Sequence, residues 1–224
     1  MKTIILKYNF KEGNSSRRLL IKEGKKKFIL KISDINEINT FHKYVPKTFS
    51  VNDKKYGRYN RDNCDYIFKY EYIKGRVLCN VVVDNKVFFE LIKMFCYFNS
   101  KGYLVWDCHT RNILVTKTKK VFFVDLGGLT KMPTTSVYYP FLRASTTLPE
   151  EWKSDNYPNS LNSEQFTIYY LSYRLLKECK LKLSKEYQKV LKKMNEVEVK
   201  NRFGSFKQIS KKLRKINKTA TNPL

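Results

Sequence analysis

Two short apolar runs separated by a turn-forming segment restrict the possible folds of this chain more than any other feature. Residues 113–115 and 121–124 are rich in β-branched and aromatic side chains, and a polar Thr/Lys segment lies between them at 116–120. This pattern predicts a β-hairpin. Because a hairpin returns its two ends to the same place, the residue that enters the first strand and the residue that leaves the second are expected to lie close together.

Polar residues flank this hairpin. Asn112 enters the first strand, Asp125 leaves the second, and Asp107 lies five residues before Asn112. An amide oxygen and carboxylates that converge in this way form a hard, oxygen-only site of the kind that binds Mg²⁺. The alternative is that Asp107 and Asn112 are ordinary turn residues and that Asp125 caps a helix.

The spacing of these residues resembles that of the protein-kinase superfamily, in which an aspartate, an asparagine five residues later and the aspartate of a D-F-G-like turn form the active site. The turn here is Asp125-Leu126-Gly127. The resemblance implies an ATP-dependent phosphotransferase with ATP and Mg²⁺ as cofactors. It assigns the acceptor proton to Asp107 and the metal to Asn112 and Asp125.

The same resemblance implies an α+β, two-lobed protein-kinase-like fold. We expect a small antiparallel β N-lobe over residues 1–73, a mainly helical C-lobe over 74–218 and a short tail at 219–224. Apolar runs at 3–10, 18–21 and 28–32 predict an antiparallel meander in the N-lobe. Apolar residues at helical spacing predict a helix with one buried face over 85–100, which a glycine at 102 terminates.

The expected nucleotide site begins with Lys31, which lies in Phe28-Ile-Leu-Lys-Ile32. This segment resembles the kinase strand whose lysine contacts the α- and β-phosphates. Glu37 is the only glutamate between Glu23 and Glu71 and is therefore the candidate partner of Lys31, although the gap between them is shorter than in most kinases. The alternative is an outward-facing lysine on an ordinary strand.

Two further segments complete this expected site. Gly13, Ser15 and Ser16 form the first turn, which in a kinase covers the phosphates, or else form an ordinary hairpin loop. The segment from Tyr66 to Gly75 resembles the connection between kinase lobes, so that Glu71 and Ile73 would offer backbone groups to the adenine.

The end of the chain carries three more landmarks of the resemblance. Leu148-Pro149-Glu150 is similar to the end of an activation segment, and Glu150 is expected to pair with Arg202. The alternative is that either residue is a solvated surface charge. Glu164, in a buried helix, falls where kinases place the residue that braces the catalytic loop.

The residues around Asp107 bear on the acceptor. Val105-Trp106 replaces the usual His-Arg, and His109 replaces the usual lysine, so that Asp107-x-His109-x-x-Asn112 resembles the loop of lipopolysaccharide core heptose and Kdo kinases. His109 would then be catalytic, or would steady the loop by packing. The leading acceptor is an anionic glycan. The alternatives are a Ser/Thr protein kinase, which the Leu148-Pro149-Glu150 segment favours, and a pseudokinase or basic binding module, which the glycine-poor first turn favours.

The charge of the chain bears on its partners. The 224 residues carry 45 lysines and arginines against 20 acidic residues, a net charge of +25. Such a field attracts anionic glycans, anionic membrane surfaces or nucleic acid, of which nucleic acid is the least expected partner. AT-rich coding is an alternative source of the excess lysine.

The cysteines and the hydropathy of the chain bear on its location. The five scattered cysteines suggest free thiols, and no segment is apolar enough for a signal peptide or a membrane span. We therefore expect a cytoplasmic protein, in peripheral contact with the inner membrane if its acceptor lies there.

Overall fold

The computed structural model describes residues 3–9, 18–33, 43–46, 48–50, 66–105, 108–124, 129–131 and 163–221. It is a mixed α+β protein with a small antiparallel sheet and several helices, as predicted. The chain divides into two compact units. Unit 1 comprises Met1–Lys74 and Phe122–Gly127, and unit 2 comprises Gly75–Val121 and Gly128–Leu224.

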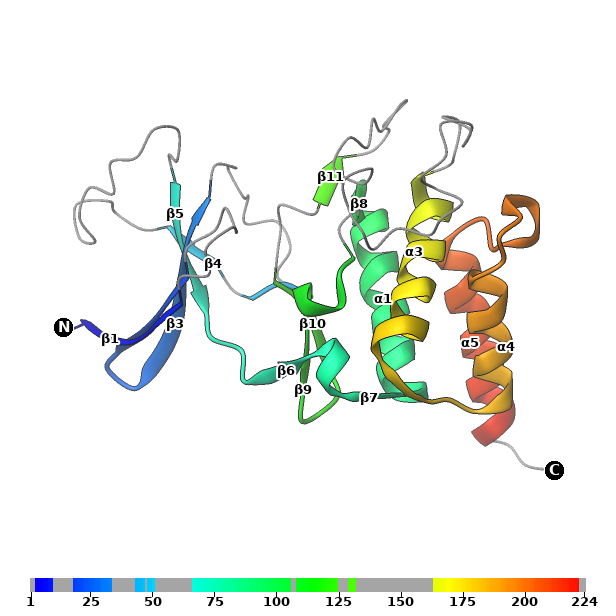
Figure 1. Ribbon diagram of the computed structural model, residues 1–224, viewed down its shortest axis with the longest axis horizontal. Coiled ribbons are helices and arrows are strands. Elements are labelled where there is room, and N and C mark those ends of the chain that lie inside the picture. Colours follow the sequence, from blue (N-terminus) through cyan, green and yellow to red (C-terminus); the bar gives the residue numbers. More distant parts are fainter. Residues whose placement is uncertain are drawn as a thin grey trace. The chain divides into compact units, whose positions relative to one another are not determined.

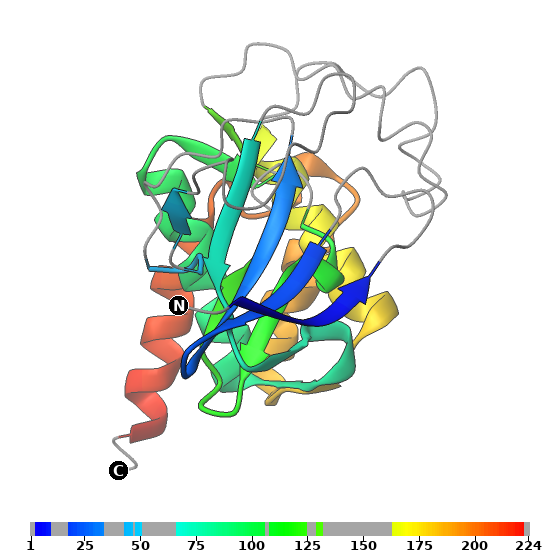
Figure 2. The same ribbon diagram turned by 90° about the vertical axis from the view of Figure 1, so that its left-hand side faces the viewer.

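Unit 1 contains a five-stranded sheet. Its strands are β1 (Thr3–Asn9), β2 (Arg18–Glu23), β3 (Lys26–Ser33), β4 (Thr48–Ser50) and β5 (Tyr66–Glu71), and all neighbouring pairs are antiparallel in the order β1-β2-β3-β5-β4. The predicted meander of the first three strands is confirmed. Figure 2 shows β1, β2, β3 and β5 one beside the next.

The two faces of this sheet differ where β2 pairs with β3. Ile21 and Phe28 lie opposite each other and are buried on one face, whereas Lys22 and Lys27 form the next pair and are exposed on the other face. Lys69 joins two strands from its place on β5, because its ammonium lies 2.9 Å from the carboxylate of Glu23 and over the ring of Phe28.

Unit 2 contains the long helices, which are α1 (Asn85–Ser100), α3 (Ser163–Glu178), α4 (Lys185–Met194) and α5 (Phe206–Thr221). Its short elements are β6 (Gly75–Val77), η2 (Leu78–Asn80), β7 (Val82–Asp84), β8 (Tyr103–Val105), η3 (Thr110–Asn112), β9 (Ile113–Thr116), β10 (Val121–Phe123), which runs on into unit 1, β11 (Leu129–Lys131), β12 (Lys180–Lys182) and η6 (Val199–Asn201). Figure 1 shows α1, α3, α4 and α5 lying side by side.

Helix α1 has the predicted bounds and lies in the core of unit 2. Asp84 caps its first turn by accepting a hydrogen bond from Val87 N at 3.0 Å. After its last turn the chain reverses at Gly102, whose φ of +77° is a left-handed conformation that glycine adopts without strain. The buried face of α1 contacts the other helices through aromatic rings. Phe95 stacks on Phe206 of α5 at 4.8 Å, and Phe88 meets Tyr187 of α4 edge-on.

The predicted hairpin is present as β9 and β10, in a three-stranded sheet of order β10-β9-β6. Thr116 closes the turn, because its carbonyl accepts from Lys119 N at 2.9 Å and its hydroxyl accepts from Lys120 N at 3.1 Å. Lys119 has a φ of 63°, and its side chain forms an ion pair with Asp84. The remaining small sheets pair β8 with β11 antiparallel and β7 with β12 parallel.

Two general expectations bear on the described part of the chain. Cys79, Cys96, Cys108 and Cys179 carry free thiols, as expected. No helix within the described ranges is long and apolar enough to cross a bilayer.

Candidate functional site

The segment that carries most of the predicted chemistry lies between β8 and β9 and contains the single turn of η3. His109 is the N-cap of this turn, and its imidazole Nδ1 accepts a hydrogen bond from Arg111 N at 3.2 Å. Its carbonyl accepts from Asn112 N at 2.8 Å. Because an acceptor Nδ1 carries no proton, the neutral ring of His109 holds its proton on Nε2. His109 thus helps to hold the turn through its side chain and its carbonyl, and its catalytic role stays a prediction.

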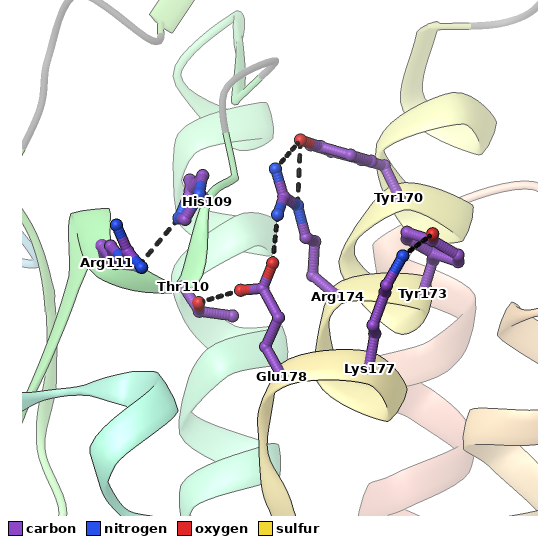
Figure 3. Close-up of polar contacts among 8 residues, drawn as sticks. All are labelled: His109, Thr110, Arg111, Tyr170, Tyr173, Arg174, Lys177 and Glu178. Atoms are coloured by element: carbon purple, nitrogen blue, oxygen red, sulfur yellow. Dashed lines mark hydrogen bonds and ion pairs between the residues drawn. The ribbon is translucent and has the colours of Figure 1, made fainter. Parts of the chain in front are cut away.

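Helix α3 holds this segment at two points. Before the loop, the buried hydroxyl of Thr167 donates to the carbonyl of Val105 at 3.1 Å. After it, the hydroxyl of Thr110 donates to the carboxylate of Glu178 at the end of α3 (Figure 3). Trp106 and Asp107 lie between these two anchors and are outside the described residues.

Glu178 belongs to a polar cluster beneath η3. Its second carboxylate oxygen accepts from Arg174, whose side chain is only 3% exposed. Arg174 in turn donates to the hydroxyl of Tyr170 from Nε at 3.0 Å and from Nη2 at 2.6 Å (Figure 3). These hydrogen bonds give the buried guanidinium of Arg174 the acceptors that a buried charge requires.

The charges in this cluster stabilise one another. Burial alone raises the pKa of Glu178, but the hydrogen bonds from Thr110 and Arg174 outweigh burial, so the pKa lies below its usual value. Burial alone lowers the pKa of Arg174, but its contacts with Tyr170 and Glu178 leave that pKa raised. Both side chains are therefore charged at neutral pH.

The structure accounts for only some of the predicted site residues. It brings His109 and the half-buried Asn112 into one turn, directly before β9. Lys31 lies on β3 between Arg18 of β2 and Phe68 of β5, and only its backbone is described. The predicted residues that lie outside the described ranges are Gly13, Ser15, Ser16, Glu37, Asp107, Asp125 and Glu150.

The predicted adenine segment lies at the end of β5. Glu71 is exposed and pairs with Phe28 of β3, and Ile73 is half-buried. Between them, Tyr72 N donates to the carbonyl of Lys27 at 3.1 Å. The sheet thus already uses the Tyr72 N–H group, so a nucleotide would have to use the backbone of Glu71 or Ile73.

Two landmark residues have contacts that the sequence did not indicate. Glu164 accepts from Phe206 N at 2.7 Å and so caps the first turn of α5. Arg202 is 5% exposed, lies over the ring of Tyr169 at 4.2 Å and donates to the carbonyls of Glu196 and Val197. Among the described residues its Nη1 has no hydrogen-bond partner.

Sequence reasoning missed the α3 cluster. Its helical members, Tyr170, Arg174 and Glu178, recur every fourth residue on one helix face, and this spacing is a signal that the sequence does contain. The partners Thr110 and Thr167 have no such signal, because single threonines near a strand or within a helix are common.

Neither a metal-ligand cluster nor a pocket among the described residues indicates a second candidate site. Within the described ranges, no three His, Cys, Asp or Glu side chains cluster closely enough to hold a metal ion. A pocket of about 530 Å³ lies between the end of α3 and α4. It is lined by Leu176, Leu183, Leu191 and Val197 among others, and by none of the predicted site residues.

No protein-family model matches this chain, and no match is found among the curated proteins.

Proposed function

We propose that this chain is an ATP-dependent phosphotransferase with a two-lobed, protein-kinase-like fold. One observation carries the proposal. The turn that holds Asn112 lies between β8 and the β9–β10 hairpin, and α3 fixes it on both sides through Thr167 and Glu178. A loop anchored in this way suits a reaction in which catalysis consists mainly of positioning.

The proposed reaction transfers the γ-phosphoryl group of ATP to an acceptor hydroxyl. The new P–O bond forms as the bond to the β-phosphate oxygen breaks, and ADP leaves. Asp107 would orient the hydroxyl and accept its proton. Lys31, with Glu37 as its partner, would position the phosphates, and Gly13, Ser15 and Ser16 would cover them.

Asn112 and Asp125 would hold Mg²⁺, which when bound neutralises the charge on the phosphates. The fit is supported at Asn112, whose amide side chain is half-buried and whose backbone is fixed by His109. An amide and carboxylates form an all-oxygen donor set that suits this cation.

For the acceptor we favour an anionic glycan, such as a phosphorylated sugar of a lipopolysaccharide core. Arg111 is exposed and directly precedes Asn112, so a positive charge lies one residue from the proposed metal ligand. The net charge of +25 also attracts an anionic acceptor. A protein acceptor is the alternative, motivated by Leu148-Pro149-Glu150.

The test is transfer of label from γ-³²P-ATP in the presence of Mg²⁺. The purified chain is incubated with a dephosphorylated core oligosaccharide in one reaction and with a mixture of proteins in another. We expect label in the oligosaccharide, reduced by about 100-fold or more in Asp107→Ala. The matched control is Lys117→Ala, an exposed turn residue whose loss should leave transfer unchanged. Label confined to protein would reject the glycan acceptor.

A binding measurement separates an inactive kinase-like protein from an active one. Mg²⁺-ATP should raise the melting temperature, because a ligand that binds only the folded state stabilises it. Asn112→Ala should reduce this rise, and Lys117→Ala should not. A rise without label in either acceptor would identify a pseudokinase, whereas no rise would reject the nucleotide site itself.

A further inference from the structure

Helix α5 has two chemically distinct faces. Its apolar side chains Phe206, Ile209 and Leu213 are buried in unit 2, where Phe206 stacks on Phe95 of α1. At about 100° per residue, five of the six basic side chains of α5 fall together on the opposite side, within an arc of about 100°. This α5 basic face consists of Lys207, Lys211, Arg214, Lys215 and Lys218, all of them exposed.

The charge of this face is not compensated by acidic side chains of its own helix. No acidic residue follows Glu198 in the sequence. Lys207, Lys211, Arg214 and Lys215 form no ion pair among the described residues, whereas the exposed lysines 189 and 200 lie beside Glu186 and Glu198. Like charges so close together repel each other, so an anionic partner would lower the energy of this face.

We propose that the α5 basic face binds the phosphate backbone of a nucleic-acid duplex. The five side chains extend over 11 residue steps, which is about 17 Å along the helix. A duplex presents one charge per about 1.7 Å of its axis, so each cation of this face can contact a phosphate. Neither the nucleotide site nor the proposed phosphotransfer is needed for this binding.

The composition of α5 favours a nucleic-acid duplex over a single strand or a membrane surface. The only aromatic residue of α5 is Phe206, which is buried, so no ring on the helix is available for bases to stack on, as single strands require. A helix that lies in a membrane surface inserts apolar side chains, and those of α5 already face the core. Phosphate contacts alone also imply that binding is independent of base sequence.

The test is fluorescence anisotropy with a labelled 20-base-pair DNA duplex of mixed sequence, titrated with the full chain at 50 to 200 mM KCl. With four to five phosphates neutralised, the plot of log K against log salt concentration should have a slope of about −4. The triple variant K207Q, K211Q and K215Q should bind roughly 100-fold more weakly at 100 mM KCl, with a slope smaller in magnitude by about 2 to 3. Glutamine keeps a similar helix propensity, and circular dichroism verifies that the variant is folded.

A matched control separates the effect of the α5 basic face from the effect of net charge alone. The variant K101Q, K117Q and K120Q removes the same charge from exposed positions elsewhere in unit 2 and should bind the duplex as the unmodified chain does. Equal losses in the two triple variants would overturn the proposal. The proposal would also fail if α5-dependent binding were seen with vesicles containing phosphatidylserine and not with the duplex. Asp107→Ala should bind the duplex normally, so failure of the kinase proposal leaves this test intact.

Discussion

The hydroxyl of Thr110 donates a hydrogen bond to the carboxylate of Glu178, which lies 68 residues later in the chain. Thr110 is fully buried, and Glu178 is the last residue of α3. The same carboxylate is paired with Arg174. Glu178 therefore links the turn that contains His109 and Asn112 to the helical core of unit 2.

The first prediction concerns the stability that Glu178 provides. Glu178→Ala should lower the free energy of unfolding by about 3 kcal/mol, because it removes a carboxylate that pairs with the buried guanidinium of Arg174. Glu178→Gln, which keeps an acceptor for Thr110, should cost less. Urea denaturation measures both values. The control is Glu186→Gln, which removes an exposed helical pair with Lys189 and should change stability by less than about 0.5 kcal/mol. Equal effects at Glu178 and Glu186 would contradict the proposed anchor.

The second prediction concerns pH. The pKa of Glu178 is lower in the folded chain than its ordinary value of 4.5, because hydrogen bonds from Thr110 and Arg174 outweigh the effect of burial. A depressed pKa contributes stability that is fully present above pH 4.5 and is lost as the pH falls through the folded value.

The difference in unfolding free energy between the unmodified chain and Glu178→Gln isolates this contribution. It should be constant from pH 7 to about pH 5 and should shrink at lower pH. Asp84, whose pKa is also lowered, is unchanged in both proteins and cancels in the comparison. A difference that is flat down to pH 3 would show that the charge of Glu178 makes no contribution.

The sequence predicts the elements of this chain better than it predicts their anchoring. The bounds of α1 and the hairpin of β9 and β10 follow from local patterns, because alternation, helical spacing and turn residues all act within a few positions. The hydrogen bond between Thr110 and Glu178 joins two distant elements, and no local pattern specifies it. Glu164 illustrates the same limit, since its place in α3 was anticipated and its contact with Phe206 was not.

The third prediction concerns Gly75, the first residue of β6. A β-carbon at this position would lie 2.9 Å from the carbonyl oxygen of Val115 on β9, and the backbone there cannot yield easily. Gly75→Ala should therefore destabilise unit 2 by about 1 to 3 kcal/mol, as overpacking does elsewhere. Thermal unfolding measures the change.

Gly204 provides the control for this substitution. A β-carbon there would meet only the flexible side chain of Gln208, at 3.5 Å. Gly204→Ala should accordingly be neutral, or stabilising by up to about 1 kcal/mol because it restricts the unfolded chain. If both substitutions cost the same, the close approach of β6 and β9 would not be the cause.

The fourth prediction concerns the orphaned nitrogen of Arg202. This side chain is held by Tyr169 and by two carbonyls, yet its buried Nη1 has no hydrogen-bond partner among the described residues. A buried donor without an acceptor costs about 1 to 3 kcal/mol, so a carboxylate is favoured there. Glu150, which lies outside the described ranges, is the partner that the sequence predicts.

A double-mutant cycle tests this pairing. Arg202→Met and Glu150→Gln are made singly and together, and their free energies of unfolding are compared. If the two side chains pair, the changes should fall short of additivity by at least about 1 kcal/mol, because either substitution alone already breaks the interaction. Glu151→Gln replaces Glu150→Gln in the control cycle and should give additive changes with Arg202→Met. Additivity in both cycles would mean that Arg202 is held by Tyr169 and the carbonyls of Glu196 and Val197 without Glu150.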